Sequence, residues 1–227
     1  MDNLFGIICD ICREIIKMKY LFSLILFFTA FCGFSQDAKS QGILDKLSTK
    51  MKGMSSFYIE FSANIKNSKS GQNENETGKG WVKGNKYYAS YGENTIISNG
   101  VKTWTVVKEE GSIYESDANA GDEGLNPKKL MTIWETGFKN AYDKESSLNG
   151  ETVHIINLTP KVPAKADYHT IVLYVSKGND LKKAIMKAKD GSVMSYSLTK
   201  FSSNPVIDDS KFVFDKKKYP GYPVIKD

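Results

Sequence analysis

Arginine and histidine are scarce in this chain of 227 residues, and its three cysteines all precede residue 33. Arg13 is the single arginine, so every later cation apart from the histidines is a lysine. Arginine makes the bidentate contacts by which proteins commonly recognise phosphates and base edges. Its absence from the rest of the chain argues against sequence-specific binding of nucleic acid, and we expect the lysines to form a solvated surface.

Catalytic and cofactor-binding motifs are missing as well. There is no G-x-S-x-G turn, no phosphate-binding Walker loop and no G-x-G-x-x-G after a strand. His154 and His169 lie in strand-like patterns without metal-ligand spacing, so they indicate ordinary strand positions. Acidic pairs such as Glu109-Glu110 lie in turns and do not match a calcium loop or a glycosidase pair. We expect no catalytic residue, no metal site, no cofactor and no enzymatic activity.

A charged start followed by an apolar run lies near the N-terminus. Lys19 follows Met18, and residues 21–34 are almost entirely apolar. This run is shorter than the roughly 20 residues that span a membrane, and small residues lie at its end, at positions 33 and 35. The pattern predicts a signal peptide that is cleaved after Ser35 or Gln36. A retained membrane anchor is the less favoured alternative.

Residues 1–17 form a second apolar segment ahead of this signal. The arrangement predicts that Met18 is the true start and that residues 1–35 are a leader. The C-x-x-C pair Cys9 and Cys12 would then never reach the mature protein. Cys32 follows the apolar run, but Phe31 occupies the position where a lipid-attachment motif has a small residue. We therefore expect a mature chain without thiols that depends on core burial for its stability.

Helical periodicity follows the leader and then changes to strand alternation. Apolar residues recur at helical spacing from Ile43 to Met54, which predicts a helix over residues 37–54. From Ser56 to Lys66 the period is two, which predicts a strand. Residues 67–80 are polar and glycine-containing, and we expect a hairpin connection there. Further strands are expected at residues 80–83, 86–91, 95–98, 102–108, 112–116, 151–159, 169–175, 181–188 and 192–201.

Asn126 and Pro127 resemble an N-cap and the first residue of a helix. They predict a short helix from residue 127 to about residue 136 with a strongly apolar face. Together these elements predict one domain over residues 36–227 of mainly β (α+β) class. Its expected architecture is a strongly curved antiparallel sheet, with helices covering an apolar cavity on its concave side.

Aromatic residues and methionines are numerous, and methionine suits pockets that accept variable apolar shapes. The predicted helices are more apolar than a single sheet requires unless they face a shared cavity. For each candidate residue, a place in the packed core is an equally good interpretation. The residues expected to line a lipid-binding cavity are Phe57, Ile59, Phe61, Trp81, Tyr91, Trp104, Leu130, Met131 and Trp134.

Several short segments follow one another in a characteristic order along the chain. They are Met54-Ser55-Ser56-Phe57, Gly80-Trp81-Val82-Lys83, Ile97-Ser98-Asn99-Gly100 with Trp104, Leu125-Asn126-Pro127, Phe212-Val213-Phe214 and Gly221-Tyr222-Pro223-Val224. In this order and spacing they resemble the LolA-like family of periplasmic outer-membrane lipoprotein carriers, and the last segment is similar to versions from the Bacteroidota. The resemblance covers nearly all of residues 37–225, and the order and spacing of the segments are more specific than any one of them.

The resemblance implies an incomplete antiparallel β-barrel whose hollow apolar interior is covered by helices. It implies a periplasmic carrier that holds the acyl chains of lipoproteins, and we expect a monomer. It also implies an inner-membrane exporter that loads the carrier and an outer-membrane acceptor that unloads it. Some carriers have an arginine after the Trp-Val-Lys segment, where this chain has Gly84, and Lys83 or Lys86 is a weak substitute. An alternative is an envelope-stress sensor or lipid-binding interaction module on the same fold, although such sensors usually carry an additional C-terminal domain.

Overall fold

The computed structural model describes residues 37–118 and 132–226, and these two stretches belong to one compact unit. The predicted leader and the start of the predicted second helix lie outside these residues. The first predicted helix is confirmed as α2 (Ala38–Lys52). Asp37 caps it by accepting hydrogen bonds from the backbone N–H groups of Lys39 and Ser40 at 2.9 and 3.3 Å.

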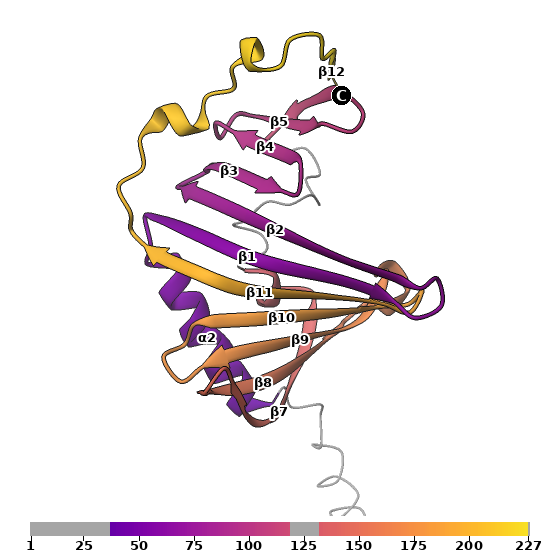
Figure 1. Ribbon diagram of the computed structural model, residues 1–227. Helices are drawn as coiled ribbons and strands as arrows, with labels where there is room; N and C mark the ends of the chain where they lie inside the picture. Colours follow the sequence, from indigo (N-terminus) through magenta and orange to yellow (C-terminus); the bar gives the residue numbers. More distant parts are fainter. Residues whose placement is uncertain (1–36, 119–131, 227) are drawn as a thin grey trace, which may run out of the picture. The chain divides into compact units, whose positions relative to one another are not determined.

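A 12-stranded, open and curved sheet forms most of the structure (Figure 1). Its order is β12-β6-β5-β4-β3-β2-β1-β11-β10-β9-β8-β7, and all neighbours are antiparallel except β12 and β6. The predicted fold class is thereby confirmed. The strands are β1 Ser56–Asn67, β2 Gln72–Lys83, β3 Lys86–Tyr91, β4 Asn94–Ser98, β5 Lys102–Val107, β6 Ser112–Asp117, β7 Phe138–Leu148, β8 Glu151–Pro160, β9 Tyr168–Ser176, β10 Leu181–Ala188, β11 Ser192–Ser203 and β12 Val224–Lys226.

The predicted connection at residues 67–80 is wrong in extent. β2 begins at Gln72 and pairs with β1 along its whole length, from Asn67 opposite Gln72 to Ser56 opposite Lys83. The first half of β2 is exposed and polar, so it lacks the alternation that reveals a half-buried strand. Backbone pairing with β1 holds it in the sheet.

β7 is an edge strand that apolar alternation does not predict, because charged and polar residues outnumber apolar ones in it. Asn140 is buried on the side of α2, where it accepts a hydrogen bond from the Ser40 hydroxyl at 2.5 Å and donates one to Gln41 at 2.7 Å. Hydrogen bonds between polar side chains thus join β7 to α2 at a position where an alternating strand would have an apolar residue. The described end of the second predicted helix is the 3₁₀ helix η1 (Ile133–Glu135).

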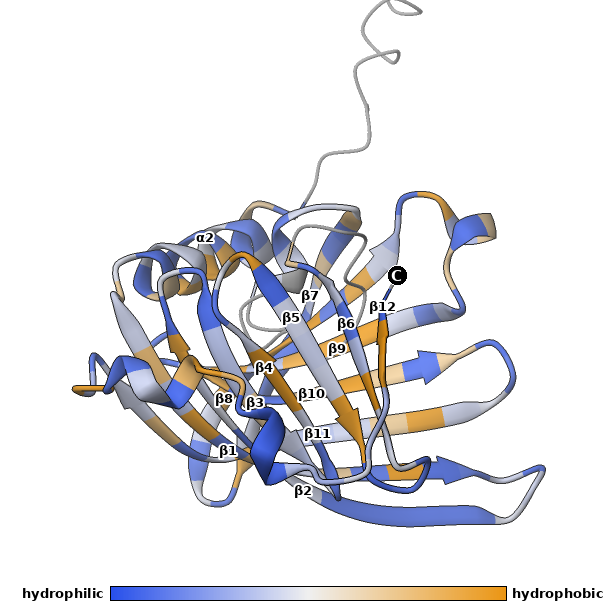
Figure 2. Ribbon diagram, turned by 90° about the horizontal axis from the view of Figure 1, so that it is seen from above, coloured by the Kyte–Doolittle hydropathy of each residue, from blue (hydrophilic) through white to orange (hydrophobic). Residues whose placement is uncertain are grey.

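The sheet has an inner face that carries α2 and an outer face opposite to it (Figure 1 and Figure 2). Directly paired residues of neighbouring strands share a face. Phe57 pairs with Val82, which pairs with Tyr87, and this row is buried on the inner face. The inner-face core joins α2 to both halves of the sheet. Its buried members are Leu44, Leu47, Met51, Phe57, Ile59, Val82, Tyr87, Ala89, Ile96, Trp134, Phe138, Ile156, Leu158, Ile171, Leu173 and Val175.

Residues 204–226 form a C-terminal segment that runs from the end of β11 to the far edge of the sheet (Figure 1). It includes η3 (Asp209–Phe212) and η4 (Lys216–Lys218), and it ends as β12 on β6. Asn204 fixes its start, because its side-chain oxygen accepts a hydrogen bond from the Ser55 backbone N–H at 2.8 Å. The segment lies against the outer face of the sheet.

Replacing Gly42 with alanine is expected to stabilise the protein. Gly42 lies on the exposed side of α2, and an added Cβ would meet nothing within 4 Å. Alanine in place of a mid-helix glycine restricts the unfolded chain, and we expect a gain of about 0.5–1 kcal/mol in the free energy of unfolding. Urea denaturation measures it. Gly150→Ala is the matched control: its surroundings are equally open, but its φ of +82° disfavours alanine, so stability should fall.

Candidate functional site

The inner face is divided into a closed part and an open part. Under α2, the helix residues Leu44 and Leu47 are fully buried against the sheet. At the C-terminal end of the helix a pocket of about 190 Å³ remains. Its lining includes Met51, Met54 and Phe57. This pocket is smaller than the roughly 300–1,000 Å³ of typical ligand sites, so binding of a long chain here requires the flexible methionine side chains to move.

Farther along the strands, half-buried apolar side chains extend the core beyond α2. We call Phe61, Tyr91, Met186, Tyr196 and Leu198 the open inner surface. The Phe61 ring stacks on Tyr91 with centroids 6.0 Å apart, and Leu198 lies directly opposite Phe61 in the β1–β11 pairing. Burial raises the pKa of the Tyr91 and Tyr196 hydroxyls, as expected for groups with little access to water.

Gly78 creates the space that the Phe61 ring occupies. These residues pair directly across β1 and β2, and a Cβ at position 78 would lie 2.1 Å from the ring. Glycine in a strand interior often marks a place where another group approaches closely. The open inner surface therefore depends on a glycine that the alternation pattern did not identify.

The predicted cavity residues are not all brought together. Phe57, Ile59 and Trp134 are buried in the inner-face core, with exposures of 5%, 3% and 4%. Phe61 and Tyr91 are half-buried and belong to the open inner surface. Leu130 and Met131 lie outside the described residues.

Trp81 and Trp104 lie on the outer face, away from the other predicted residues. Trp81 pairs directly with Tyr58 of β1. The Tyr58 side chain points to the face opposite that of its neighbour Phe57, so Trp81 lies on the outer face as well. The Trp104 ring stacks on Phe214 of the C-terminal segment, with centroids 5.1 Å apart and planes at 9°. Its indole N–H donates a hydrogen bond to Glu115 at 3.0 Å. Both tryptophans thus lie on the face covered by the C-terminal segment.

Lys83 and Lys86 also contact the C-terminal segment. These are the two lysines that lie closest in sequence to the position where some LolA-like carriers have an arginine. Their ammonium groups lie 2.8 and 3.1 Å from the Asp209 carboxylate. Lys83 also donates a hydrogen bond to the carbonyl of Ile207 at 3.0 Å. These lysines lower the pKa of Asp209. The contacts of these two lysines therefore hold the C-terminal segment against the outer face of the sheet.

The two histidines occupy strands as predicted, His154 in β8 and His169 in β9. His154 lies 3.3 Å from the Tyr142 hydroxyl, and His169 lies 2.9 Å from the hydroxyl of the neighbouring Thr170. Within residues 37–118 and 132–226, no group of three or more histidine, cysteine, aspartate and glutamate side chains is arranged to hold a metal. Among the same residues, no helix has the length and apolar character that crossing a membrane requires.

The fold and this site define a class: proteins with an open, curved antiparallel sheet whose apolar inner face is partly covered by an N-terminal helix. The family model described as outer membrane lipoprotein carrier protein LolA matches residues 52–215. The chain belongs to this family. The resemblance noted in the sequence is thereby confirmed at the level of the family.

Solved structures similar to this chain include one with a TM-score above 0.5, which supports the fold. An uncharacterized conserved protein from Thermus thermophilus superimposes with a TM-score of 0.53 at 10% identity, covering 83% of this chain and 99% of that one. A LolA superfamily protein from Nitrosomonas europaea gives a TM-score of 0.41 at 14% identity, with 77% and 97% covered. The MucA/MucB complex of Pseudomonas aeruginosa gives 0.39 at 11% identity, with 79% and 62% covered. Comparison with curated proteins gives no match.

Proposed function

We propose that this protein is a non-enzymatic periplasmic carrier that binds the acyl chains of lipoproteins on its open inner surface. The observation that carries the proposal is the continuity between a buried apolar core and half-buried residues such as Phe61 and Leu198. An acyl chain laid on these residues would extend the core. Burying each CH₂ group contributes about 0.8 kcal/mol, so such a carrier needs no catalytic group.

Membership of the LolA family supports this proposal. On this hypothesis the chain is exported with its signal peptide removed, receives cargo from an inner-membrane exporter and releases it to an outer-membrane acceptor as a monomer. Phe57, Ile59 and Trp134 would support the site from the core, and only the residues beyond α2 would contact cargo without rearrangement. Leu130 and Met131 remain proposed cargo contacts. Trp81 and Trp104 would contribute to the outer face instead.

Replacing Leu198 with aspartate tests the proposal. A carboxylate beside Phe61 makes the open inner surface polar, and we expect co-purification of acylated polypeptide from the native envelope to fall at least about tenfold. That factor equals the loss of contact with about two CH₂ groups. Mass spectrometry of the purified protein identifies and quantifies the cargo.

Val193→Asp is the matched control, because Val193 is exposed and lies on the same strand but on the opposite face. It should leave cargo unchanged, and circular dichroism verifies that both variants fold. Normal cargo on a folded Leu198→Asp protein would contradict the proposal. Recovery of a membrane-anchored regulator in place of acylated cargo would support the envelope-stress sensor.

A further inference from the structure

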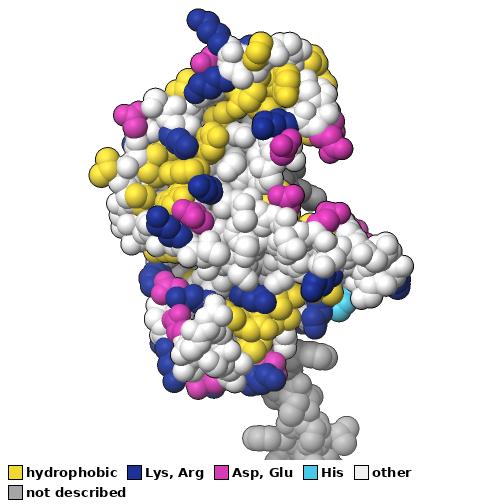
Figure 3. Space-filling model, in the orientation of Figure 1, with side chains coloured by type: hydrophobic (Ala, Val, Ile, Leu, Met, Phe, Trp, Pro, Cys, Tyr) yellow, Lys and Arg dark blue, Asp and Glu magenta, His cyan; other side chains and the backbone are white. Residues whose placement is uncertain are grey.

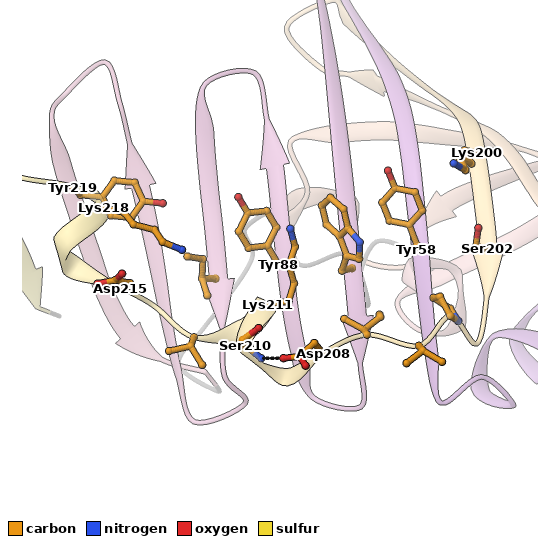
Figure 4. A pocket seen from close by; sticks show the side chains of 16 residues that line it. Tyr58, Tyr88, Lys200, Ser202, Asp208, Ser210, Lys211, Asp215, Lys218 and Tyr219 are labelled. Carbon is orange, nitrogen blue, oxygen red and sulfur yellow. Dashed lines mark hydrogen bonds between the residues drawn. The ribbon is translucent and has the colours of Figure 1, made fainter.

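A second cavity lies on the outer face, between the sheet and the C-terminal segment, and has a volume of about 640 Å³ (Figure 4). Three aromatic residues on neighbouring strands form its sheet side: Tyr58, Trp81 and Tyr88 pair directly across β1, β2 and β3. Their rings contact one another, with centroids 4.7 Å apart for Tyr58 and Trp81 and 5.6 Å apart for Trp81 and Tyr88. The inner-face carrier site uses none of these side chains.

Lys211 extends from the C-terminal segment over this aromatic row. Its ammonium nitrogen is 3.8 Å from the Trp81 ring centroid and 4.1 Å from that of Tyr88, in cation–π geometry. Burial, together with the positive charges of Lys218 and Lys79, lowers the pKa of Lys211. Among the described residues, no carboxylate lies within ion-pair distance of Lys211 or Lys218. A bound anion would compensate this partly desolvated charge.

The carboxylates around the cavity already have other partners. Asp208 accepts a hydrogen bond from the backbone N–H of Ser210, and Asp215 accepts one from the backbone N–H of Lys217. Glu60 accepts a hydrogen bond from the Tyr58 hydroxyl. Burial and this contact with Glu60 raise the pKa of Tyr58 to about 12, so the hydroxyl remains a neutral donor. The side chains that line the cavity include Lys200, Lys211 and Lys218 but only two carboxylates, Asp208 and Asp215, so cationic groups outnumber anionic ones there.

Exposed apolar residues lie at the edge of the same cavity. Val206 is fully exposed and Val213 is 60% exposed, and both line it from the C-terminal segment. Three consecutive lysines, residues 216–218, follow on η4. Figure 3 shows hydrophobic side chains interspersed with lysines along this edge of the molecule. Lysines combined with exposed apolar residues are typical of proteins that bind the interface of an anionic membrane.

We propose that the outer-face cavity binds the phosphate of an anionic phospholipid headgroup and thereby holds the C-terminal segment against an anionic bilayer. Lys211 and Lys218 provide the charge that meets the phosphate. Val206 and Val213 enter the interfacial layer of the membrane. This site is separate from the open inner surface, so a carrier would contact a membrane with one face while its cargo occupies the other.

Flotation of the purified protein with vesicles of equal parts phosphatidylglycerol and phosphatidylcholine tests the proposal. We expect binding that is absent with pure phosphatidylcholine and that weakens with added salt. The double variant Lys211→Gln/Lys218→Gln should lower the affinity about 25-fold, since each lysine near an anionic surface contributes about a factor of five. Val206→Asp/Val213→Asp, which alters exposed side chains alone, should also lower it.

The matched control is Lys161→Gln/Lys165→Gln, which removes the same charge from exposed positions around the 3₁₀ helix Pro163–Lys165. It should retain nearly full binding. Equal losses in both lysine variants would overturn the proposal by indicating general charge attraction. Binding to polyglutamate but not to vesicles would overturn it in favour of an acidic protein partner. Leu198→Asp should bind vesicles normally, so failure of the carrier proposal and failure of this one are distinguishable.

Discussion

Replacing Phe212 with alanine should destabilise the protein by about 3–5 kcal/mol, the usual cost of removing a buried phenylalanine ring. Phe212 is 1% exposed at the end of η3, on the outer face and separate from the core under α2. Its loss would leave a cavity beneath the C-terminal segment, because neighbouring anchors such as the Lys83–Asp209 ion pair hold the backbone in place. Urea denaturation followed by circular dichroism measures the change.

The adjacent Val213 provides the matched control for this result. It is 60% exposed, so Val213→Ala should change the free energy of unfolding by less than about 0.5 kcal/mol. If Phe212→Ala were as mild as Val213→Ala, the C-terminal segment would be attached only by its polar contacts and by β12. A large difference between the two variants means that the segment is an integral part of the fold.

Trp134→Ala should also cost about 3–5 kcal/mol. Trp134 is 4% exposed within the inner-face core, and its indole N–H donates a hydrogen bond to the Ser48 hydroxyl of α2 at 2.8 Å. Removing the ring breaks the contact between η1 and the helix and leaves a cavity in the core. The change in the free energy of unfolding and the acyl-chain binding of the variant are measured together.

Trp134→Phe separates packing from hydrogen bonding. Phenylalanine retains most of the apolar volume and loses the bond to Ser48, so we expect a cost of about 1–2 kcal/mol. If Trp134 mainly lined an open cargo cavity, Trp134→Ala would leave stability nearly unchanged and alter binding alone. A loss of stability that exceeds the loss of binding identifies Trp134 as a core residue that supports the site.

The sequence pattern was most informative where a strand or helix has one buried face. The apolar stripe of α2 and the alternation of β1 predicted both elements within two residues of their observed ends. The sequence pattern did not predict β7 or the first half of β2, where backbone pairing and side-chain hydrogen bonds hold polar strands in the sheet. It also missed β12, whose three residues are too few to show a period.

The candidate site was predictable only in part, as Phe61 and Trp81 illustrate. Alternation places Phe57, Ile59 and Phe61 on one side of β1, but it cannot say which residues of β2 share that side. The register of the β1–β2 pair decides this, and a tight turn after Asn67 sets the register. The polar start of β2 gives no alternation from which the position of this turn could be predicted. The sequence therefore predicts that Trp81 and Phe61 line the same cavity, although Trp81 lies on the opposite face.

By itself the sequence determined the fold class, the family and the apolar character of the proposed carrier, because burial imposes a period on side chains that are close along the chain. Only the tertiary structure decided which apolar residues are core, which form the open inner surface and which lie under the C-terminal segment. The pairing of Tyr58 with Trp81 and the approach of Lys211 to both Trp81 and Tyr88 join residues far apart in sequence. Local periodicity carries no information about such contacts, since they follow from strand register and from the path of the last 23 residues of the described chain across the outer face.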